Sequence, residues 1–76
     1  MPQFYFHIRE PGLFVPDEEG MYLPDLKQAQ QEAHRSCLDL LRNRVHGHLS
    51  GVGLRIEIAD ASGKIIDSVN VRDGFH

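Results

Sequence analysis

The sequence predicts an α+β domain in which one helix packs on one face of a four-stranded antiparallel sheet, in the element order ββαββ. One long segment, Leu26 to Val45, has the 3.6-residue periodicity of an amphipathic helix. Short alternating segments lie before and after it, and they are separated by turn-forming glycine and proline residues. With 76 residues, the chain is predicted to fold as a single domain, residues 1–76.

The predicted helix places apolar or small residues on one broad face. These residues are Leu26, Ala29, Ala33, Cys37, Leu40, Leu41 and Val45. Asp25 is a suitable N-cap, because its carboxylate can accept hydrogen bonds from the free N–H groups of the first turn. Alanines occupy the early part of this face, so we expect the helix to approach the sheet closely there. Leu38 and His34 fall outside the apolar stripe and suggest a second contact surface, although a single exposed leucine is ordinary.

Two strands are predicted before the helix. Residues Gln3 to Arg9 alternate, with Phe4, Phe6 and Ile8 on one side. Pro11-Gly12 is a turn signal. Residues 13–23 are interpreted as one broken or bulged strand with an acidic turn in its middle. Because Pro16 has no backbone N–H to donate, this strand is expected at an edge of the sheet.

Two further strands are predicted after a glycine-containing loop, residues 46–53. The third strand points Leu54, Ile56 and Ile58 inward. Asp60-Ala61-Ser62-Gly63 is a predicted hairpin turn, and Lys64 to Arg72 form the fourth strand. Asp67 interrupts the alternation of the fourth strand, and a bulge near it would restore the apolar side. Residues 73–76 are expected to form a tail.

The spatial order of the strands can also be predicted. A helix of about 20 residues spans roughly 30 Å, which is enough to return along the whole sheet. If the first and third strands are neighbours, every adjacent pair is antiparallel and the crossover through the helix is right-handed. The predicted order is therefore 2-1-3-4, with the proline-containing strand at the edge.

The sheet face opposite the helix is the best candidate for a functional surface. It is expected to carry the outward residues of the first and third strands, which are Tyr5, His7, Arg9, Arg55 and Glu57. Antiparallel sheets can leave one face in water, so a solvated face is one interpretation. Tyrosine and arginine are favoured at protein interfaces, so a homodimer or partner surface is another. Binding of a small molecule or a nucleic acid is a third.

Composition narrows the classes of function. The formal net charge is −3 and the pI about 5.9, which disfavours direct binding to nucleic acid through a basic patch. The single cysteine, Cys37, indicates no disulfide framework and fits a reducing compartment. No secretory signal is recognised, and no apolar run approaches the roughly 20 residues of a membrane span. We therefore expect a soluble cytoplasmic protein with no membrane partner.

Motifs that would indicate chemistry are weak. His46 and His48 could begin a metal site with His34, His76 or a carboxylate, but no zinc-ligand spacing is present and no metal is predicted. Residues 17–20 lack the alternating ligands of a calcium loop. Gly51-Val52-Gly53 lacks the third glycine of a dinucleotide fingerprint, so no cofactor is predicted. His7 and Glu57 could form an acid–base pair, but an open sheet face lacks an enclosing pocket, and no enzymatic activity is expected.

Several motifs, taken in order, resemble a family of short, largely alphaproteobacterial proteins. The matching segments are Phe6-His7-Ile8-Arg9, Val15-Pro16-Asp17-Glu18-Glu19-Gly20, Leu23-Pro24-Asp25-Leu26 with Ala29 and Ala33, Arg55-Ile56-Glu57-Ile58 and Val69-Asn70-Val71-Arg72-Asp73. The family is a domain of unknown function. The resemblance therefore implies a fold, and it implies no catalytic residues.

A weaker similarity connects the chain with antitoxins of the HicB type. Those proteins also have an acidic-Gly turn that leads to Pro-Asp-Leu before a helix. Here Leu26 enters the helix directly, whereas those proteins insert another strand, and no DNA-binding segment is appended. The first expectation is therefore a non-enzymatic protein–protein interaction module, with a homodimer through the exposed sheet face or an edge strand as one form of it. The alternative is a HicB-like regulatory protein that acts with a partner on nucleic acid.

Overall fold

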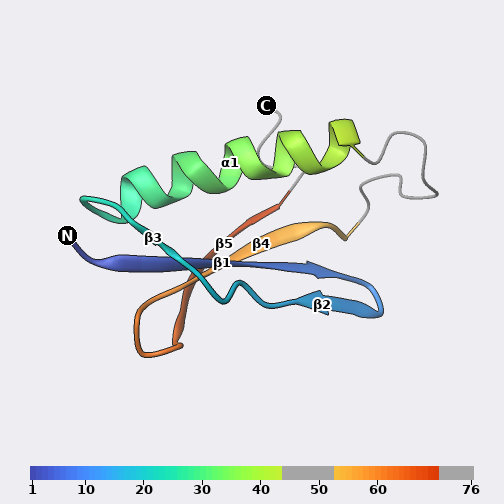
Figure 1. Ribbon diagram of the computed structural model, residues 1–76. Helices are drawn as coiled ribbons and strands as arrows, with labels where there is room; N and C mark the ends of the chain where they lie inside the picture. The colour runs from blue at the N-terminus through green and yellow to red at the C-terminus, as the bar shows by residue number, and fades with distance from the viewer. Residues whose placement is uncertain (44–52, 71–76) are drawn as a thin grey trace.

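The computed structural model describes residues 1–43 and 53–70, with the side chains of residues 40–43 outside that description. Its elements are β1 (Gln3–Glu10), β2 (Leu13–Val15), β3 (Met21–Tyr22), α1 (Leu26–Asn43), β4 (Arg55–Ala59) and β5 (Ile65–Asn70). The antiparallel sheet has the order β2-β1-β4-β5, and α1 packs on one face of it (Figure 1). The predicted fold class and the predicted order 2-1-3-4 are confirmed.

The segment predicted as one broken edge strand is divided into β2 and β3. Both pair with β1, β2 along Ile8–Glu10 and β3 along Gln3–Phe4. Pro16 lies between them, outside either strand. Since proline cannot donate a ladder hydrogen bond, its position explains why the pairing stops after Val15.

The helix begins where the sequence predicts. The backbone N–H of Gln28 donates to the Asp25 carboxylate at 2.9 Å, so Asp25 is the N-cap. Leu26 was predicted on the buried face, and this is wrong, because the residue is 37% exposed. It precedes Ala29, the first helical residue in the core. The helix is described to Asn43, and the predicted residues up to Val45 and the stop at Gly47 lie outside the described residues.

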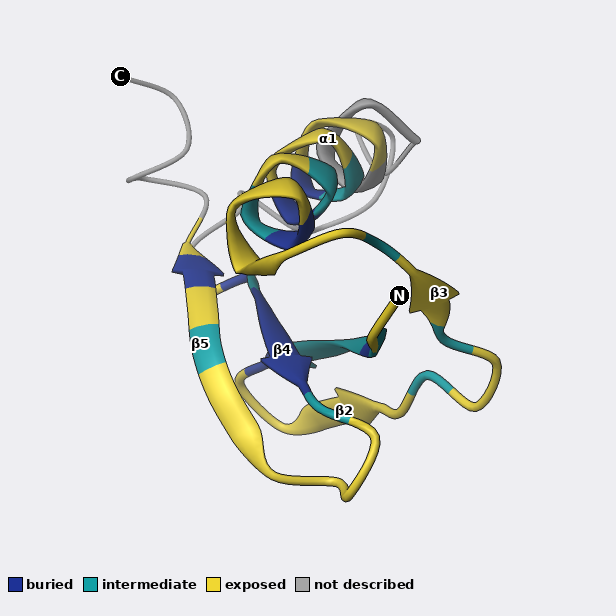
Figure 2. Cartoon of the chain, turned by 90° about the vertical axis from the view of Figure 1, so that its left-hand side faces the viewer, coloured by how far each residue is buried: buried dark blue, intermediate teal, exposed yellow. Residues whose placement is uncertain are grey.

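Small residues on α1 bring it close to the sheet. Ala29, Ala33 and Cys37 are fully buried, and they pack with a group of larger side chains from the strands. That group comprises Phe4, Leu54, Ile56, Ile58 and Val69. The main contacts of α1 are with β4 and β5. Figure 2 shows the consequence, since β4 and the inner side of α1 are buried whereas β2, β3 and most of β5 are exposed.

The fourth strand contains the predicted irregularity. Ala59 pairs with Ile65 and Ile58 pairs with Asp67, so Ile66 is the extra residue of a bulge next to Asp67. This bulge does not restore an apolar side. Asp67 stays on the α1 side, where its carboxylate accepts a 2.5 Å hydrogen bond from the Gln30 amide, and both isoleucines are exposed.

Candidate functional site

The sheet face opposite α1, called the far face below, holds the five residues singled out in the sequence. His7 lies opposite Glu57, Arg9 opposite Arg55, and Tyr5 opposite Ala59. Residues that pair directly across two strands share a face, so the register brings all five together as predicted. They are half-buried, apart from Glu57, which is buried.

Glu57 lies between two arginines. Its Oε1 accepts from Nε of Arg9 at 3.2 Å, and its Oε2 accepts from Nε and Nη2 of Arg55 at 3.3 and 3.2 Å. The Glu57 side chain is 11% exposed, whereas the two arginine side chains are 42% and 43% exposed. Like charges directly opposite each other destabilise a sheet, so Glu57 is the residue that allows Arg9 and Arg55 to be neighbours. One carboxylate for two guanidinium groups leaves the far face locally positive.

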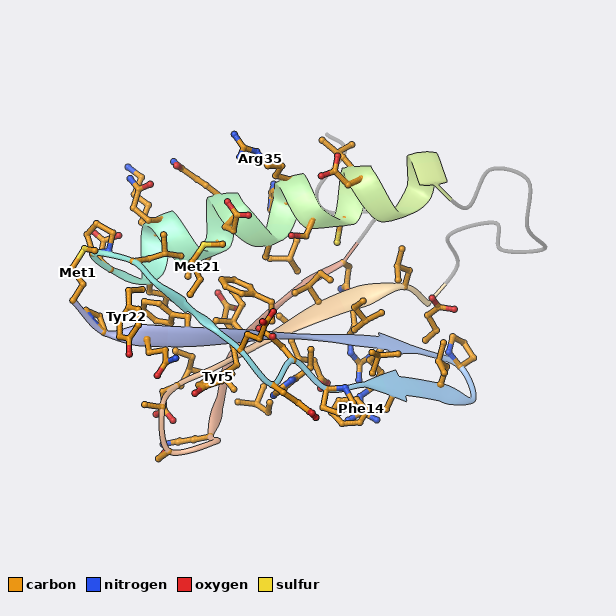
Figure 3. All side chains as sticks on the ribbon, in the orientation of Figure 1. Met1, Tyr5, Phe14, Met21, Tyr22 and Arg35 are labelled. Carbon is orange, nitrogen blue, oxygen red and sulfur yellow. The ribbon has the colours of Figure 1, made fainter. Side chains whose placement is uncertain are left out.

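Phe14 is a member of this site that the sequence reasoning missed. The Cζ atom of Arg9 lies 4.2 Å from the centre of the Phe14 ring, and the ring of His7 meets that ring edge-on at 5.5 Å. Phe14 pairs with Arg9 across β1 and β2, and Figure 3 shows it with Tyr5 on the side away from α1. Phe14 stands between Leu13 and Val15 in the sequence, so strand alternation could have placed it on the opposite face of the sheet from those two residues. We call Tyr5, His7, Arg9, Phe14, Arg55 and Glu57 the far-face cluster.

Asp17 fixes the border of the cluster. Its Oδ2 accepts from the backbone N–H of Phe6 at 3.1 Å, and its Oδ1 accepts from those of Glu19 and Gly20 at 3.1 and 3.3 Å. Phe6 lies between the part of β1 that pairs with β2 and the part that pairs with β3, so the carboxylate takes the place of a strand partner. Burial raises the pKa of Asp17, but the three N–H donors and the nearby His7 outweigh it, and the pKa is lowered overall.

His7 and Tyr5 are held by the same turn. The backbone N–H of Asp17 donates to Nδ1 of His7 at 2.9 Å, so a neutral His7 carries its proton on Nε2. Gly20 has a φ of +73°, and a Cβ atom there would lie 3.0 Å from the Tyr5 ring and 3.1 Å from the carbonyl oxygen of Phe4. Only glycine allows the turn to lie this close to the cluster without strain.

Other chemical groups do not assemble into a site within the described residues. No three His, Cys, Asp or Glu side chains gather there in a way that could hold a metal ion. His46, His48 and His76, proposed as possible ligands, lie outside the described residues. Burial raises the pKa of the Cys37 thiol, although a backbone hydrogen bond with Ile56 opposes this, and the thiol contacts the Val69 carbonyl oxygen at 3.8 Å. No helix in the described part of the chain is both long and apolar enough to cross a membrane.

The fold and the far-face cluster define a small α+β domain with a polar and aromatic sheet face. The chain belongs to the domain of unknown function DUF6894, whose family model matches residues 3–72. No curated protein and no solved structure matches the chain. This family, like the one that the sequence resembles, is a domain of unknown function. The geometry of the far face is therefore the main guide to function.

Proposed function

We propose that this domain is a non-enzymatic protein–protein interaction module that binds through the far-face cluster. The observation that carries the proposal is the preorganised pair Arg9 and Arg55. Arg9 is held over Phe14 by stacking and to Glu57 by an ion pair, and Arg55 is bound to the same carboxylate. Arginine and aromatic residues dominate binding hot spots, and side chains that are already ordered lose less entropy on binding.

The cluster also has hydrogen-bonding capacity to offer. Among the described residues, Arg9 donates to Glu57 only through Nε, and Arg55 through Nε and Nη2. A guanidinium group has five N–H donors in a fixed fork, so several remain for a partner. Together with the local excess of positive charge, this favours an acidic segment on the partner protein.

Self-association is included in the proposal. β5 is an edge strand, and its Ile65 and Ile66 side chains are 45% and 37% exposed. Edge strands with apolar residues tend to pair with other strands, and a domain of this size gains stability from oligomerisation. A homodimer could therefore form through the edge of β5 or through the far face.

The absence of enzymatic activity is likewise proposed. His7 and Glu57 are the pair on the far face that could act as acid and base, since they lie directly opposite each other. Nδ1 of His7 is engaged by the backbone of Asp17, and both oxygens of Glu57 are engaged by arginines. Groups tied into structure in this way are poorly placed to exchange protons with a substrate.

Cross-linking and capture from the native cell test the proposal, combined with light scattering of the purified chain. An Arg9→Ala, Arg55→Ala double variant is expected to lose the captured partner or the dimer. The matched control is Arg35→Ala, because Arg35 is an arginine on the outer side of α1 whose side chain is 75% exposed (Figure 3). A strictly monomeric chain whose captured proteins are the same in the double variant and the control would contradict the proposal.

A HicB-like regulatory role is the second candidate. The half-exposed guanidinium groups of Arg9 and Arg55 favour it, because they could contact phosphate oxygens next to a bound partner. The net charge of −3 opposes direct binding. A gel shift at low salt separates the two candidates, since the interaction module is expected to give no shift with DNA or RNA.

We also propose that the protein is bacterial and cytoplasmic. The support is the sequence resemblance to short, largely alphaproteobacterial proteins and the single, buried thiol of Cys37. Fractionation of the native cell would test this. Recovery of the chain in an extracytoplasmic fraction would contradict it.

A further inference from the structure

The sheet is wider than the helix that covers it. Neighbouring strands lie about 4.8 Å apart, so β2-β1-β4-β5 spans roughly 14 Å between the outer strands, whereas one helix with its side chains is about 10 Å across. Since α1 packs mainly on β4 and β5, part of the β1–β2 half of the same face has no helix over it among the described residues. On this face of β1, Phe4 and Glu10 are buried near the two ends of the strand, whereas Phe6 and Ile8 between them are only partly buried.

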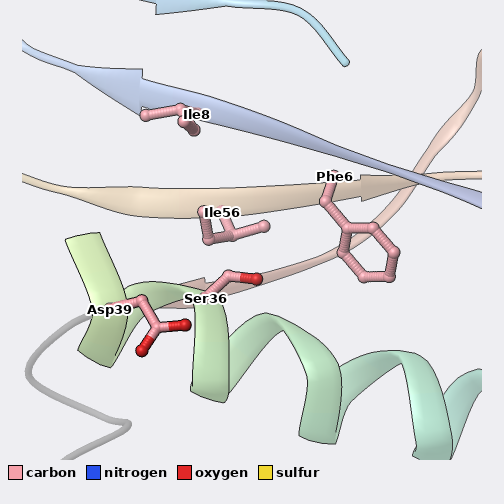
Figure 4. Close-up of a pocket in the computed structure, with 5 residues that line it drawn as sticks. All are labelled: Phe6, Ile8, Ser36, Asp39 and Ile56. Carbon is pink, nitrogen blue, oxygen red and sulfur yellow. The ribbon is translucent and has the colours of Figure 1, made fainter. Parts of the chain in front are cut away.

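A groove marks this uncovered half. Its volume is about 270 Å³, and Figure 4 shows Phe6, Ile8 and Ile56 from the strands facing Ser36 and Asp39 of α1. We call these five residues the open groove. Its sheet side continues onto β2, because Val15 pairs with Ile8 and Leu13 pairs with Glu10 on this face. Val15 and Leu13 are 40% and 43% exposed, so the apolar surface of Val15 adjoins Ile8 at the groove, while Leu13 lies beside the buried Glu10.

The width and the chemistry of this strip indicate its occupant. Helices that pack side by side lie 8–10 Å apart, and strands lie about 4.8 Å apart, so the axis of a helix beside α1 would run above β1 and β2. A second copy of α1 is poorly suited to it, because the side of α1 opposite the buried alanines carries Gln31, Arg35 and Leu38. Burying an arginine against Phe6 and Ile8 would be costly.

Charge favours a basic segment. The α1 wall of the open groove carries Asp39. About two turns earlier on the same side of α1 lies Glu32, whose carboxylate is 4.0 Å from the Arg35 guanidinium, so Asp39 is the carboxylate that remains for a partner at the groove. The chain as a whole has a net charge of −3. A lysine or arginine on the flank of an incoming helix would therefore meet a carboxylate at the edge of the groove.

We propose that the open groove binds an amphipathic helix of a partner protein. The helix lies beside α1, its apolar side contacts Phe6, Ile8 and Val15, and a basic residue on its flank pairs with Asp39. Binding would complete a two-layer domain with two helices on one sheet face, in the helix-in-groove mode of peptide recognition. The inference rests on the proposed interaction role and adds to it a second surface and the class of partner.

A designed peptide tests the proposal without knowledge of the natural partner. The probe is a helix of about 16 residues with leucine at positions i, i+3, i+4 and i+7 and lysine beside them. It is titrated into the full, isotope-labelled chain and followed by NMR chemical shifts. Shifts are expected at Phe6, Ile8, Ser36, Asp39 and Ile56, and not at Ser62 or Lys64 in the turn between β4 and β5.

Variants make the test specific. Ile8→Asp is expected to weaken peptide binding by about tenfold or more. Val15→Asp is expected to have the same effect, and because Val15 is exposed, this substitution should not unfold the domain. Asp39→Lys should weaken the lysine peptide about tenfold and should be rescued by a peptide with glutamate in place of lysine. Lys64→Gln, at an exposed position in the turn between β4 and β5, should leave binding unchanged.

Three results would overturn the proposal. The first is a folded chain that does not bind the peptide, and the second is binding that is indifferent to reversal of the charge at position 39. The third is a homodimer, detected by light scattering, that buries the open groove. Each of them leaves the far-face proposal standing, because that proposal is tested by Arg9 and Arg55 and not by the groove.

Discussion

The two halves of the sheet are held together by different forces. The β4–β5 half is covered by α1, and its inner residues Ile56 and Ile58 are 1% and 0% exposed. The β1–β2 half, with β3, has three exposed apolar residues in β2, and its turn is held by three backbone N–H groups that donate hydrogen bonds to the Asp17 carboxylate. The comparison teaches that apolar burial under α1 dominates one half of this small domain, while the other half adds hydrogen bonds in its turn to a smaller buried core and keeps apolar surface exposed.

Truncation of a buried isoleucine should distinguish the halves most strongly. Ile58→Ala is expected to destabilise the domain by about 2–5 kcal/mol, because it removes a fully buried side chain and leaves a cavity. Ile8→Ala, on the uncovered half, is expected to cost about 1 kcal/mol, since Ile8 is only partly buried. Urea unfolding measures both. Equal costs would mean that the groove is filled in solution.

Enlargement of a helical residue gives the second test. Ala33→Leu forces a larger side chain between α1 and β4, where Ala33 has no exposed surface, and should cost about 1–3 kcal/mol. Ser36→Leu, one turn away on the wall of the open groove, has room and should change stability by less than about 0.5 kcal/mol. Thermal unfolding of the two variants provides the comparison, and a large cost for Ser36→Leu would contradict an open groove.

Acid should act on the β1–β2–β3 half through Asp17. Because the pKa of Asp17 is lower in the folded state than its ordinary value of 3.8, its contribution to stability is present above that value and is lost as the pH falls through the lowered pKa. Asp17→Asn retains an oxygen acceptor but loses the second one, and should cost about 1–2 kcal/mol at pH 7.

Urea unfolding at neutral pH and near pH 3 measures this effect. The difference between wild type and Asp17→Asn is expected to shrink in acid, because below pH 3.8 the unfolded chain takes up a proton at Asp17 more readily than the folded chain with its lowered pKa. The same pair of measurements on Asp60→Asn provides a comparison in the β4–β5 turn. There, hydrogen bonds from Ser62 and from the backbone of Lys64 also lower the pKa of the Asp60 carboxyl. A difference for Asp17→Asn that is independent of pH would show that its hydrogen bonds do not require the charge.

The smallest effect is expected at the start of α1. Asp25→Ala removes the acceptor for the Gln28 N–H and should cost about 1 kcal/mol. The control is Asp39→Ala, an exposed acidic residue of the same helix, which should be nearly neutral. Equal costs for the two variants, measured by thermal unfolding, would argue against a capping role for Asp25.

Much of the fold follows from short-range signals in the sequence. Alternation in Gln3–Arg9, the Asp25 cap and the alanine-rich face predicted the elements, and the antiparallel rule predicted their order. The same alternation placed the five far-face residues together. These features depend on neighbours in the chain, which is why they could be read from it.

The remainder depends on contacts between distant segments. Phe14 stacks on Arg9 and Asp17 binds the Phe6 backbone only once β1 and β2 are paired. The position of α1 over β4 and β5, and hence the open groove, is decided by side-chain packing in three dimensions. Asp67 lies on the α1 side because the Gln30 amide donates a hydrogen bond to its carboxylate. The alternation of residues within the strand does not predict this contact.

The most direct test of the uneven coverage is the rate of thiol labelling in the native state. Ile8→Cys, Val15→Cys and Ile58→Cys would each be made in a Cys37→Ala background and treated with a thiol reagent. Uneven coverage predicts that the thiols at positions 8 and 15 react without unfolding, and that the thiol at position 58 reacts only when the domain opens. If the thiol at position 8 is as protected as the thiol at position 58, the β1–β2 half is covered and this picture of the domain is wrong.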